Sequence, residues 1–256
     1  MVVVAAGVAV GAAVATTGTT GPDKAAATHL LRASLAAAEK AGSFHYVASS
    51  VSSTPFNPSS SPVSQVTVGD AGVLGGRQMI TIAKHTFDVI VTGTTAFFEG
   101  DADAMVDELG VPTSVAHSYA GRWISLVPGD TPYQSVEVAV TTSSALQQNV
   151  TFTANEEIPT AKIDGEPVIG LRGPMGKQQG QVAKGTATLY VAARGKHLPV
   201  RYVEQGTVGT GQQASKFEFS LAFSAWGEAV STTAPAGAVA FSSLEASGPS
   251  GPTIIT

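Results

Sequence analysis

The chain has 256 residues, enough for one large domain or two small ones. Its net charge of −5 argues against nucleic acid as a partner, because phosphate contacts need a basic surface. The absence of cysteine excludes disulfides, thiolate metal sites and a cysteine nucleophile. Charged residues make up 13%, about half of the usual ~25%, and 28 Gly with 14 Pro supply many turns, so the composition favours a folded, β-rich protein.

The N-terminus is an apolar run followed by a polar linker. Val2–Ala15 contains only small or apolar residues, and fourteen helical residues would reach about 21 Å, short of the ~30 Å hydrocarbon core. This length fits a secretory h-region, with Ala13–Ala15 as an A-x-A cleavage pattern. Only the Met1 amine supplies positive charge, so either translation begins upstream or the signal is a poor one; a buried strand is the alternative. We expect an extracytoplasmic protein, in the cell envelope or secreted, or tethered by this segment if it is not cleaved.

The first half of the remaining chain predicts one helix and a run of strands. The helix spans residues 24–41, with Asp23 as a plausible N-cap and Gly42 as its stop. Its thin, alanine-rich apolar face predicts packing on a sheet. From Ser43 the period changes to two, which predicts strands near residues 44–48, 63–70, 77–84, 85–92 and 94–99, with turns at 69–72 and 75–76.

The second half predicts short helices and then more strands. The helices span residues 101–109, capped by Asp101, 113–120, capped by Thr113, and 142–148. A strand carries Trp123, and further strands are predicted near residues 149–154, 160–164, 167–172, 186–192, 198–205, 215–224 and 239–244. Short connections between strands favour an antiparallel meander. We therefore predict an α+β fold with helices on one face of a large antiparallel sheet: one domain at 22–246, a signal-like segment with linker at 1–21, and a flexible tail at 247–256.

The stretch Ser215–Val230 carries the clearest period of two. Phe217, Phe219, Leu221 and Phe223 alternate with charged or small residues, which places four large apolar side chains on one face of a strand. Three aromatic rings on one face need an apolar surface opposite them. That surface is either a protein core or a bound ligand.

No motif of catalysis or cofactor binding fits its required context. The glycines of residues 170–177 have the wrong spacing for a phosphate loop, and the G-x-G-x-x-A string at 209–214 precedes a strand instead of a helix. The five histidines lack metal-ligand spacing, and the acids of residues 99–108 suit a capped, solvated helix better than a calcium loop. We expect no enzyme activity, no cofactor and no metal.

One segment of this acidic protein is basic. Between Glu166 and Glu204 there is no acid, whereas six basic residues occur there: Arg172, Lys177, Lys184, Arg194, Lys196 and Arg201. They could contact an anionic headgroup or a membrane surface. The alternative is that they are polar hairpin edges that guard against sheet-to-sheet pairing.

An ordered series of segments resembles the actinobacterial LppX/LprG-type lipoproteins, relatives of the LolA-like lipoprotein carriers. The segments are LAAAEKAGSFHY, FFEGDADAMVDELG, YAGRWISLVPGDTPY, KIDGEPVIGLRG, TATLYVAARGKHLPVRYVEQG and FSAWGEAVSTTAPAGAV, which together run through most of the chain. The resemblance implies a half-barrel, a strongly curved antiparallel sheet whose concave face is closed by helices. It also implies a non-enzymatic envelope protein that carries a lipid, a lipoglycan or a lipoprotein. The family's acylated Cys is absent from this chain, so we expect it to be soluble after cleavage or held by the uncleaved segment.

The main functional hypothesis is therefore a protein that binds a lipid or lipoglycan-like amphiphile in a hydrophobic cavity, for transport or handling in the cell envelope. We expect a monomer that contacts no nucleic acid. The alternative is a protein-interaction or sensor module on the same fold, without lipid cargo. The candidate cavity-lining residues are Phe87, Val89, Val91, Leu189, Val191, Phe217, Phe219, Leu221 and Phe223, with Met105 and Leu109 as lid contacts. A closed core made of the same residues remains an equal alternative.

Overall fold

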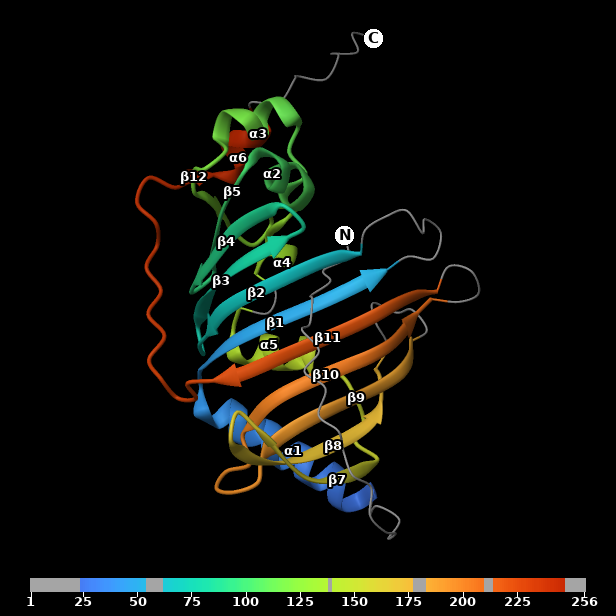
Figure 1. Cartoon of the computed structure of the whole chain (residues 1–256). Helices are drawn as coiled ribbons and strands as arrows, with labels where there is room; N and C mark the ends of the chain where they lie inside the picture. The colour runs from blue at the N-terminus through green and yellow to red at the C-terminus, as the bar shows by residue number, and fades with distance from the viewer. Residues whose placement is uncertain (1–23, 54–61, 138–139, 177–182, 210–213, 247–256) are drawn as a thin grey trace.

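The computed structural model describes residues 24–53, 62–137, 140–176, 183–209 and 214–246, and within these ranges twelve strands form one sheet. Neighbouring strands of this sheet are antiparallel except for one pair at an edge. The sheet curves without closing on itself, so the predicted α+β half-barrel is confirmed (Figure 1).

The elements follow one another in two runs of strands separated by helices. The first run comprises α1 (Lys24–Ala41), β1 (Phe44–Ser53), β2 (Val63–Ala71), β3 (Gly75–Ile82), β4 (His85–Thr92) and β5 (Thr95–Gly100). The middle comprises α2 (Ala102–Leu109), α3 (Thr113–Tyr119), β6 (Ile124–Leu126), α4 (Tyr133–Val136) and α5 (Thr142–Asn149). The second run comprises β7 (Glu156–Ile163), β8 (Glu166–Pro174), β9 (Ala183–Ala192), β10 (Pro199–Val208), β11 (Ser215–Ser224), β12 (Val239–Ala240) and α6 (Phe241–Ala246). Across the sheet the strands lie in the order β12-β6-β5-β4-β3-β2-β1-β11-β10-β9-β8-β7, and the parallel pair is β12 with β6.

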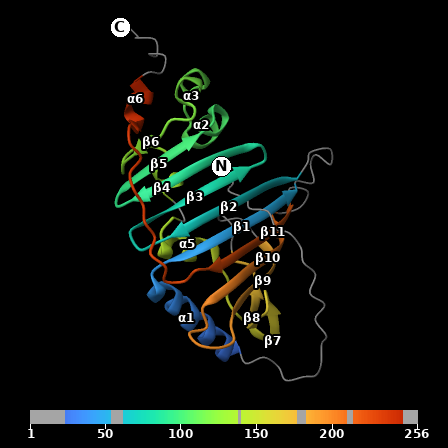
Figure 2. The same ribbon diagram turned by 60° about the vertical axis from the view of Figure 1, so that its left-hand side comes forward.

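A pairing between distant segments joins the two runs. β1 lies between β2 and β11, with Tyr46 opposite Gly69 on one side and opposite Phe223 on the other. After β11 the chain leaves the middle of the sheet and follows its flank to β12, at the far edge (Figure 2). The sheet is thus continuous although its two runs of strands are far apart in sequence.

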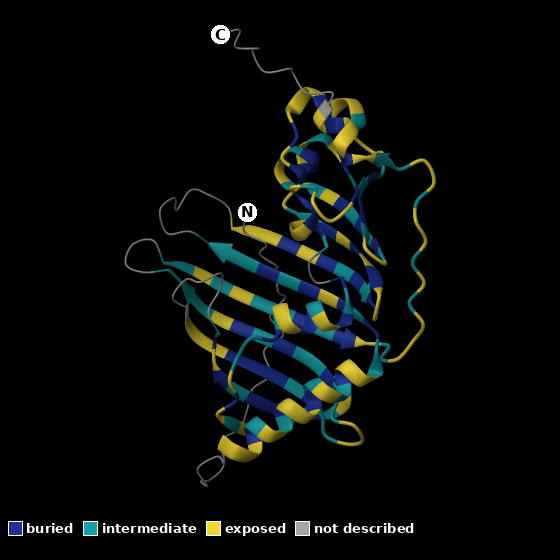
Figure 3. Ribbon diagram, turned by 180° about the vertical axis from the view of Figure 1, so that it is seen from behind, coloured by how far each residue is buried: buried dark blue, intermediate teal, exposed yellow. Residues whose placement is uncertain are grey.

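The described helices cover one face of the sheet, which we call the inner face; the opposite face is the outer face (Figure 3). Two groups of buried apolar residues lie on the inner face. In the α1 cluster, α1 and α5 pack on β1 and β8–β11. In the α2 cluster, α2, α3, α4 and α6 pack on β3–β6. None of the helices in the described ranges has the length and hydrophobicity needed to cross a membrane.

Several local predictions are confirmed at the residues that carried them. α1 has the predicted bounds, and it is followed by Gly42 with a φ of 80°. Asp101 caps α2, because its side chain accepts a hydrogen bond from the Ala104 amide at 2.8 Å. Asp23 lies outside the described residues. The predicted Thr113 cap is wrong, since Pro112 occupies the cap position of α3 and makes no side-chain bond.

The glycines of the β2–β3 connection were assigned wrongly. The predicted turn at 69–72 lies partly within β2, and Gly75 and Gly76 begin β3. This strand position is a glycine because the Tyr46 ring lies against residue 69, and a Cβ there would come within 2.6 Å of that ring. Gly76 similarly admits the Val140 carbonyl. Both glycines make room for close neighbours and do not bend the chain.

Two predicted strands are also wrong. Residues 149–154 complete α5 and then cross β8 without joining the sheet, with the carbonyls of Thr151 and Thr153 close above Gly176 and Gly173. A side chain at either glycine would block this crossing. At 239–244 only Val239 and Ala240 are extended, and the residues after them form α6.

Candidate ligand-binding face

The phenylalanine-rich strand lies near the middle of the sheet. β11 pairs with β1 and β10, and its four large apolar side chains point to the inner face, as the alternation predicted. Leu221 and Phe223 are buried, whereas Phe217 and Phe219 are only half-buried. The apolar stripe therefore becomes more open toward the end of the sheet where β11 begins, which we call the Phe217 end.

The predicted site residues fall into two groups. Phe87, Val89, Val91, Met105 and Leu109 belong to the α2 cluster and are all buried. Leu189, Val191, Leu221 and Phe223 are buried in the α1 cluster, and Phe217 and Phe219 pack against it. The two groups were expected to line one cavity, but they lie over different parts of the sheet. That either group contacts a ligand stays a prediction.

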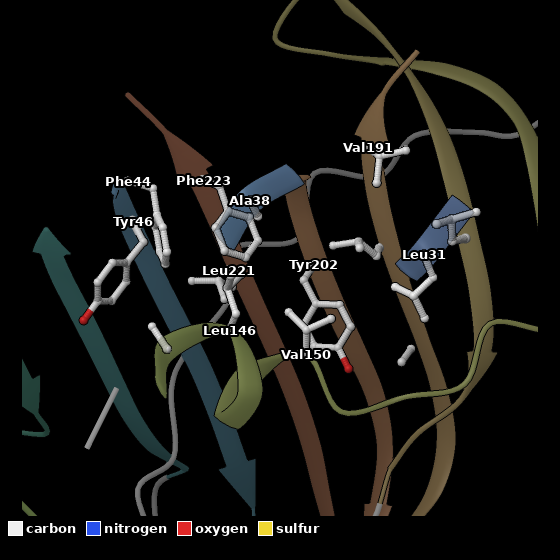
Figure 4. Packing of buried hydrophobic residues seen from close by; sticks show 14 of the residues in the cluster. Leu31, Ala38, Phe44, Tyr46, Leu146, Val150, Val191, Tyr202, Leu221 and Phe223 are labelled. Carbon is white, nitrogen blue, oxygen red and sulfur yellow. The ribbon is translucent and has the colours of Figure 1, made fainter. Parts of the chain in front are cut away.

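Small residues of α1 face the α1 cluster. Ala27, Leu31, Ser34 and Ala38 are the buried positions of this helix, and α5 adds Leu146 (Figure 4). Because most of these side chains are short, the helix lies close to the sheet. This closeness supports a tightly filled α1 cluster away from the Phe217 end.

Aromatic rings continue the cluster toward the Phe217 end. The Tyr202 ring lies 5.6 Å from that of Phe152 and 6.0 Å from that of Phe219, measured between centroids. The rings of Phe217 and Phe219 are nearly parallel, with an interplanar angle of 8° and centroids 6.4 Å apart. Phe152, Phe217 and Phe219 are all half-buried, so this aromatic group forms the accessible margin of the apolar core.

A buried acid lies within this aromatic group. Glu204 is 2% exposed, and the Tyr202 hydroxyl, itself buried, donates a hydrogen bond to its Oε1 at 2.5 Å. Burial raises the pKa of Glu204, and the bond from Tyr202 offsets this only in part. Burial also raises the pKa of Tyr202, and the nearby Glu204 raises it further. The pair is therefore held in its protonated forms more strongly than either group would be in water.

Polar side chains extend from Glu204 across the inner face. The strand register places Gln65, Ser50, Phe219 and Glu204 in one row over β2, β1, β11 and β10. Ser50 is 0% exposed, and its Oγ has no hydrogen-bond partner within the described part of the chain. Gln65 donates to Thr67 Oγ1 at 3.1 Å. We call this row, in which Ser50 and Glu204 stand on either side of Phe219, the polar row.

Met175 covers the inner face beside the polar row. Its sulfur rests where side chains of Gly185 and Gly206 would stand, since a Cβ at these positions would lie 2.5 and 2.6 Å from Sδ. Gly206 is opposite Phe217 in the register. Met175 is 8% exposed, so a flexible side chain closes the space between the glycines and solvent.

The basic residues of the segment between Glu166 and Glu204 do not form one patch in the described ranges. Arg194 and Lys196 lie in the β9–β10 connection, whereas Lys184 is near the opposite end of β9. Arg172 lies 3.5 Å from Glu156 and Arg201 lies 3.9 Å from Asp164, both pairs partly solvated. Lys177 is outside the described residues.

Other titratable groups form local pairs. Across three strands of the outer face, Asp70 accepts hydrogen bonds from His45 and Arg77, each at 2.7 Å. Although burial alone would raise the pKa of Asp70, these two partners hold it below its ordinary value. Among the described residues, no three His, Asp or Glu side chains are grouped as a metal site would require.

Sequence reasoning missed Glu204, Tyr202, Ser50 and Met175. One signal could have identified the first two: in the predicted strand 198–205 they alternate with Arg201 and Val203, which places them on the same face. Ser50 lies beyond the predicted strand at 44–48, and its burial depends on the segments that cover β1.

Comparison with known proteins gives similarity to solved structures alone; no family model and no curated sequence matches the chain. LprF from Mycobacterium bovis is 15% identical with a TM-score of 0.47, covering 85% of this chain and 100% of its own. The Mycobacterium tuberculosis lipoprotein LppX is 18% identical with a TM-score of 0.48, covering 82% and 99%. A chain of the Pseudomonas aeruginosa MucA/MucB complex is 12% identical with a TM-score of 0.36, covering 83% and 59%. These are similarities of the backbone fold.

Proposed function

We propose that this protein binds a lipid or another amphiphile at the Phe217 end of the inner face, as a non-enzymatic protein of the cell envelope or an exported one. One observation carries the proposal: the half-buried rings of Phe217 and Phe219 continue directly into the buried α1 cluster. Each methylene that an acyl chain buries against such a surface contributes about 0.8 kcal/mol, so binding needs no catalytic group. The resemblance of the sequence segments to envelope lipid carriers agrees with this function.

The first test is native mass spectrometry of the protein purified without detergent, followed by solvent extraction of any bound lipid. We expect a discrete co-purifying amphiphile that is lost in the variant Phe217→Asp. Ser220→Asp is the matched control, because it places the same charge on a residue of β11 that points to the outer face. A mass of protein alone, together with failure of added lipids to bind, would contradict the proposal.

A second candidate function has its own observation. On the outer face Val47, Val66 and Met79 are 39%, 41% and 45% exposed, and the register brings Val47, Val68 and Met79 into one row. Apolar side chains grouped on a solvated sheet face suit contact with a partner protein. If no amphiphile binds but Met79→Lys abolishes a reproducible protein complex, the interaction module replaces the lipid carrier.

A further inference from the structure

The polar row places hydrogen-bonding groups on both sides of one aromatic ring. Ser50 and Glu204 are the register partners of Phe219 on β1 and on β10. Adjacent strands are about 4.8 Å apart, so the two polar side chains start roughly 10 Å from each other with the ring between them. A small headgroup above Phe219 would have both within reach.

The Ser50 hydroxyl is a buried hydrogen-bonding group on the inner face that lacks a partner among the described residues. By alternation the buried Ser50 side chain lies on the same face as Tyr46 and Ala48. Buried polar groups in native proteins nearly always have a partner. A group from outside the described structure is therefore the natural complement of this hydroxyl.

The chemistry of the row selects one kind of headgroup. Glu204 contributes a carboxyl group, Ser50 an unpaired oxygen, and Phe217 and Phe219 the negative faces of their rings. A cation beside Glu204 favours the ionised form of its carboxyl group, and the resulting carboxylate attracts the cation together with the ring faces. An ammonium with N–H groups can also donate to a hydroxyl oxygen. An anionic headgroup would instead be repelled by the Glu204 carboxylate. By alternation in their strands, Arg172 and Arg201 point to the outer face and would not repel a cation here.

We propose that the polar row binds the primary ammonium headgroup of a single-chain amphiphile, with the ammonium above Phe219 between Ser50 and Glu204 and the alkyl chain along Phe217 and Met175. This inference rests on the proposed function, since it names the headgroup class of the amphiphile bound at the same face. Met175 moves aside to admit the chain. The glycines beneath it leave the space that the chain then fills.

The test compares three probes that share a twelve-carbon chain: dodecylammonium, dodecanol and dodecyl sulfate, each titrated below its micelle concentration by isothermal calorimetry. We expect dodecylammonium to bind roughly tenfold more tightly than the other two. In Glu204→Gln the ratio of the dodecylammonium and dodecanol affinities should fall toward one. Glu218→Gln, an exposed acid of β11 on the outer face, should keep the wild-type ratio.

The outcomes separate the two proposals. If all three probes bind equally, or if Glu204→Gln keeps the preference, the headgroup assignment is wrong and the lipid-binding function stands. If none binds, the proposed function fails and the headgroup assignment fails with it. Should Glu204→Gln not fold, Ser50→Ala is compared with Ser49→Ala, its neighbour on the outer face. An unchanged ratio in Ser50→Ala would then overturn the assignment.

Discussion

Replacement of Glu204 by glutamine should change how stability depends on pH. Burial raises the pKa of Glu204 in the folded protein, whereas in the unfolded chain it has the ordinary value of about 4.3. Below the ordinary pKa both states are protonated and the group adds no pH dependence. Between the ordinary and the raised pKa only the unfolded chain ionises, so the free energy of unfolding falls by up to ~1.4 kcal/mol per pH unit. Above the raised pKa the slope returns to zero.

Glutamine does not titrate, and its amide oxygen can still accept the Tyr202 hydroxyl. The variant should therefore gain stability relative to the wild type as the pH rises through this window. Urea unfolding followed by circular dichroism from about pH 4 to about pH 8 measures the difference, with Glu218→Gln as an exposed control. A difference that does not change with pH would refute the reasoning. A difference that instead favours the wild type at high pH would mean that the folded protein stabilises the carboxylate.

Three further substitutions test the local structure through urea unfolding. Gly69→Ala should cost about 1–3 kcal/mol, because its Cβ would press on the Tyr46 ring, and Tyr46→Ala should remove most of this added cost. Asp101→Ala should cost about 1 kcal/mol by removing the cap of the Ala104 amide, whereas Asp101→Asn should cost less. Leu221→Ala should cost about 3 kcal/mol, as a buried leucine whose removal leaves a cavity in the α1 cluster. Equal stability of any of these variants and the wild type would contradict the assigned contact.

Local patterns were sufficient for most of the elements. The alternation from Phe217 to Phe223 predicted both the strand and its apolar face, and Asp101 predicted the start of α2. These signals depend only on residues that are close in sequence. For the same reason the sequence indicated an antiparallel meander but not the insertion of β1 between β2 and β11.

The errors depend on contacts between distant segments. Gly173 and Gly176 admit the carbonyls of Thr153 and Thr151, which belong to a segment predicted as a strand. The sequence did not indicate Glu204 as a site residue, because glutamates are rarely buried and are expected to be solvent-exposed. Its burial follows from the aromatic rings of neighbouring strands and of the crossing segment, which only the three-dimensional structure brings together.

The separation of the two apolar clusters gives the sharpest test of where a ligand binds. Leu189 in the α1 cluster and Leu126 in the α2 cluster are both 0% exposed, and each should cost about 3 kcal/mol when replaced by alanine. Leu189 is the register partner of Tyr202, so its loss would loosen the aromatic group beside the polar row. Leu189→Ala should therefore weaken dodecylammonium binding several-fold, and Leu126→Ala should leave it unchanged. Equal weakening in the two variants, at equal stability, would mean that one cavity spans both clusters, as the sequence first suggested.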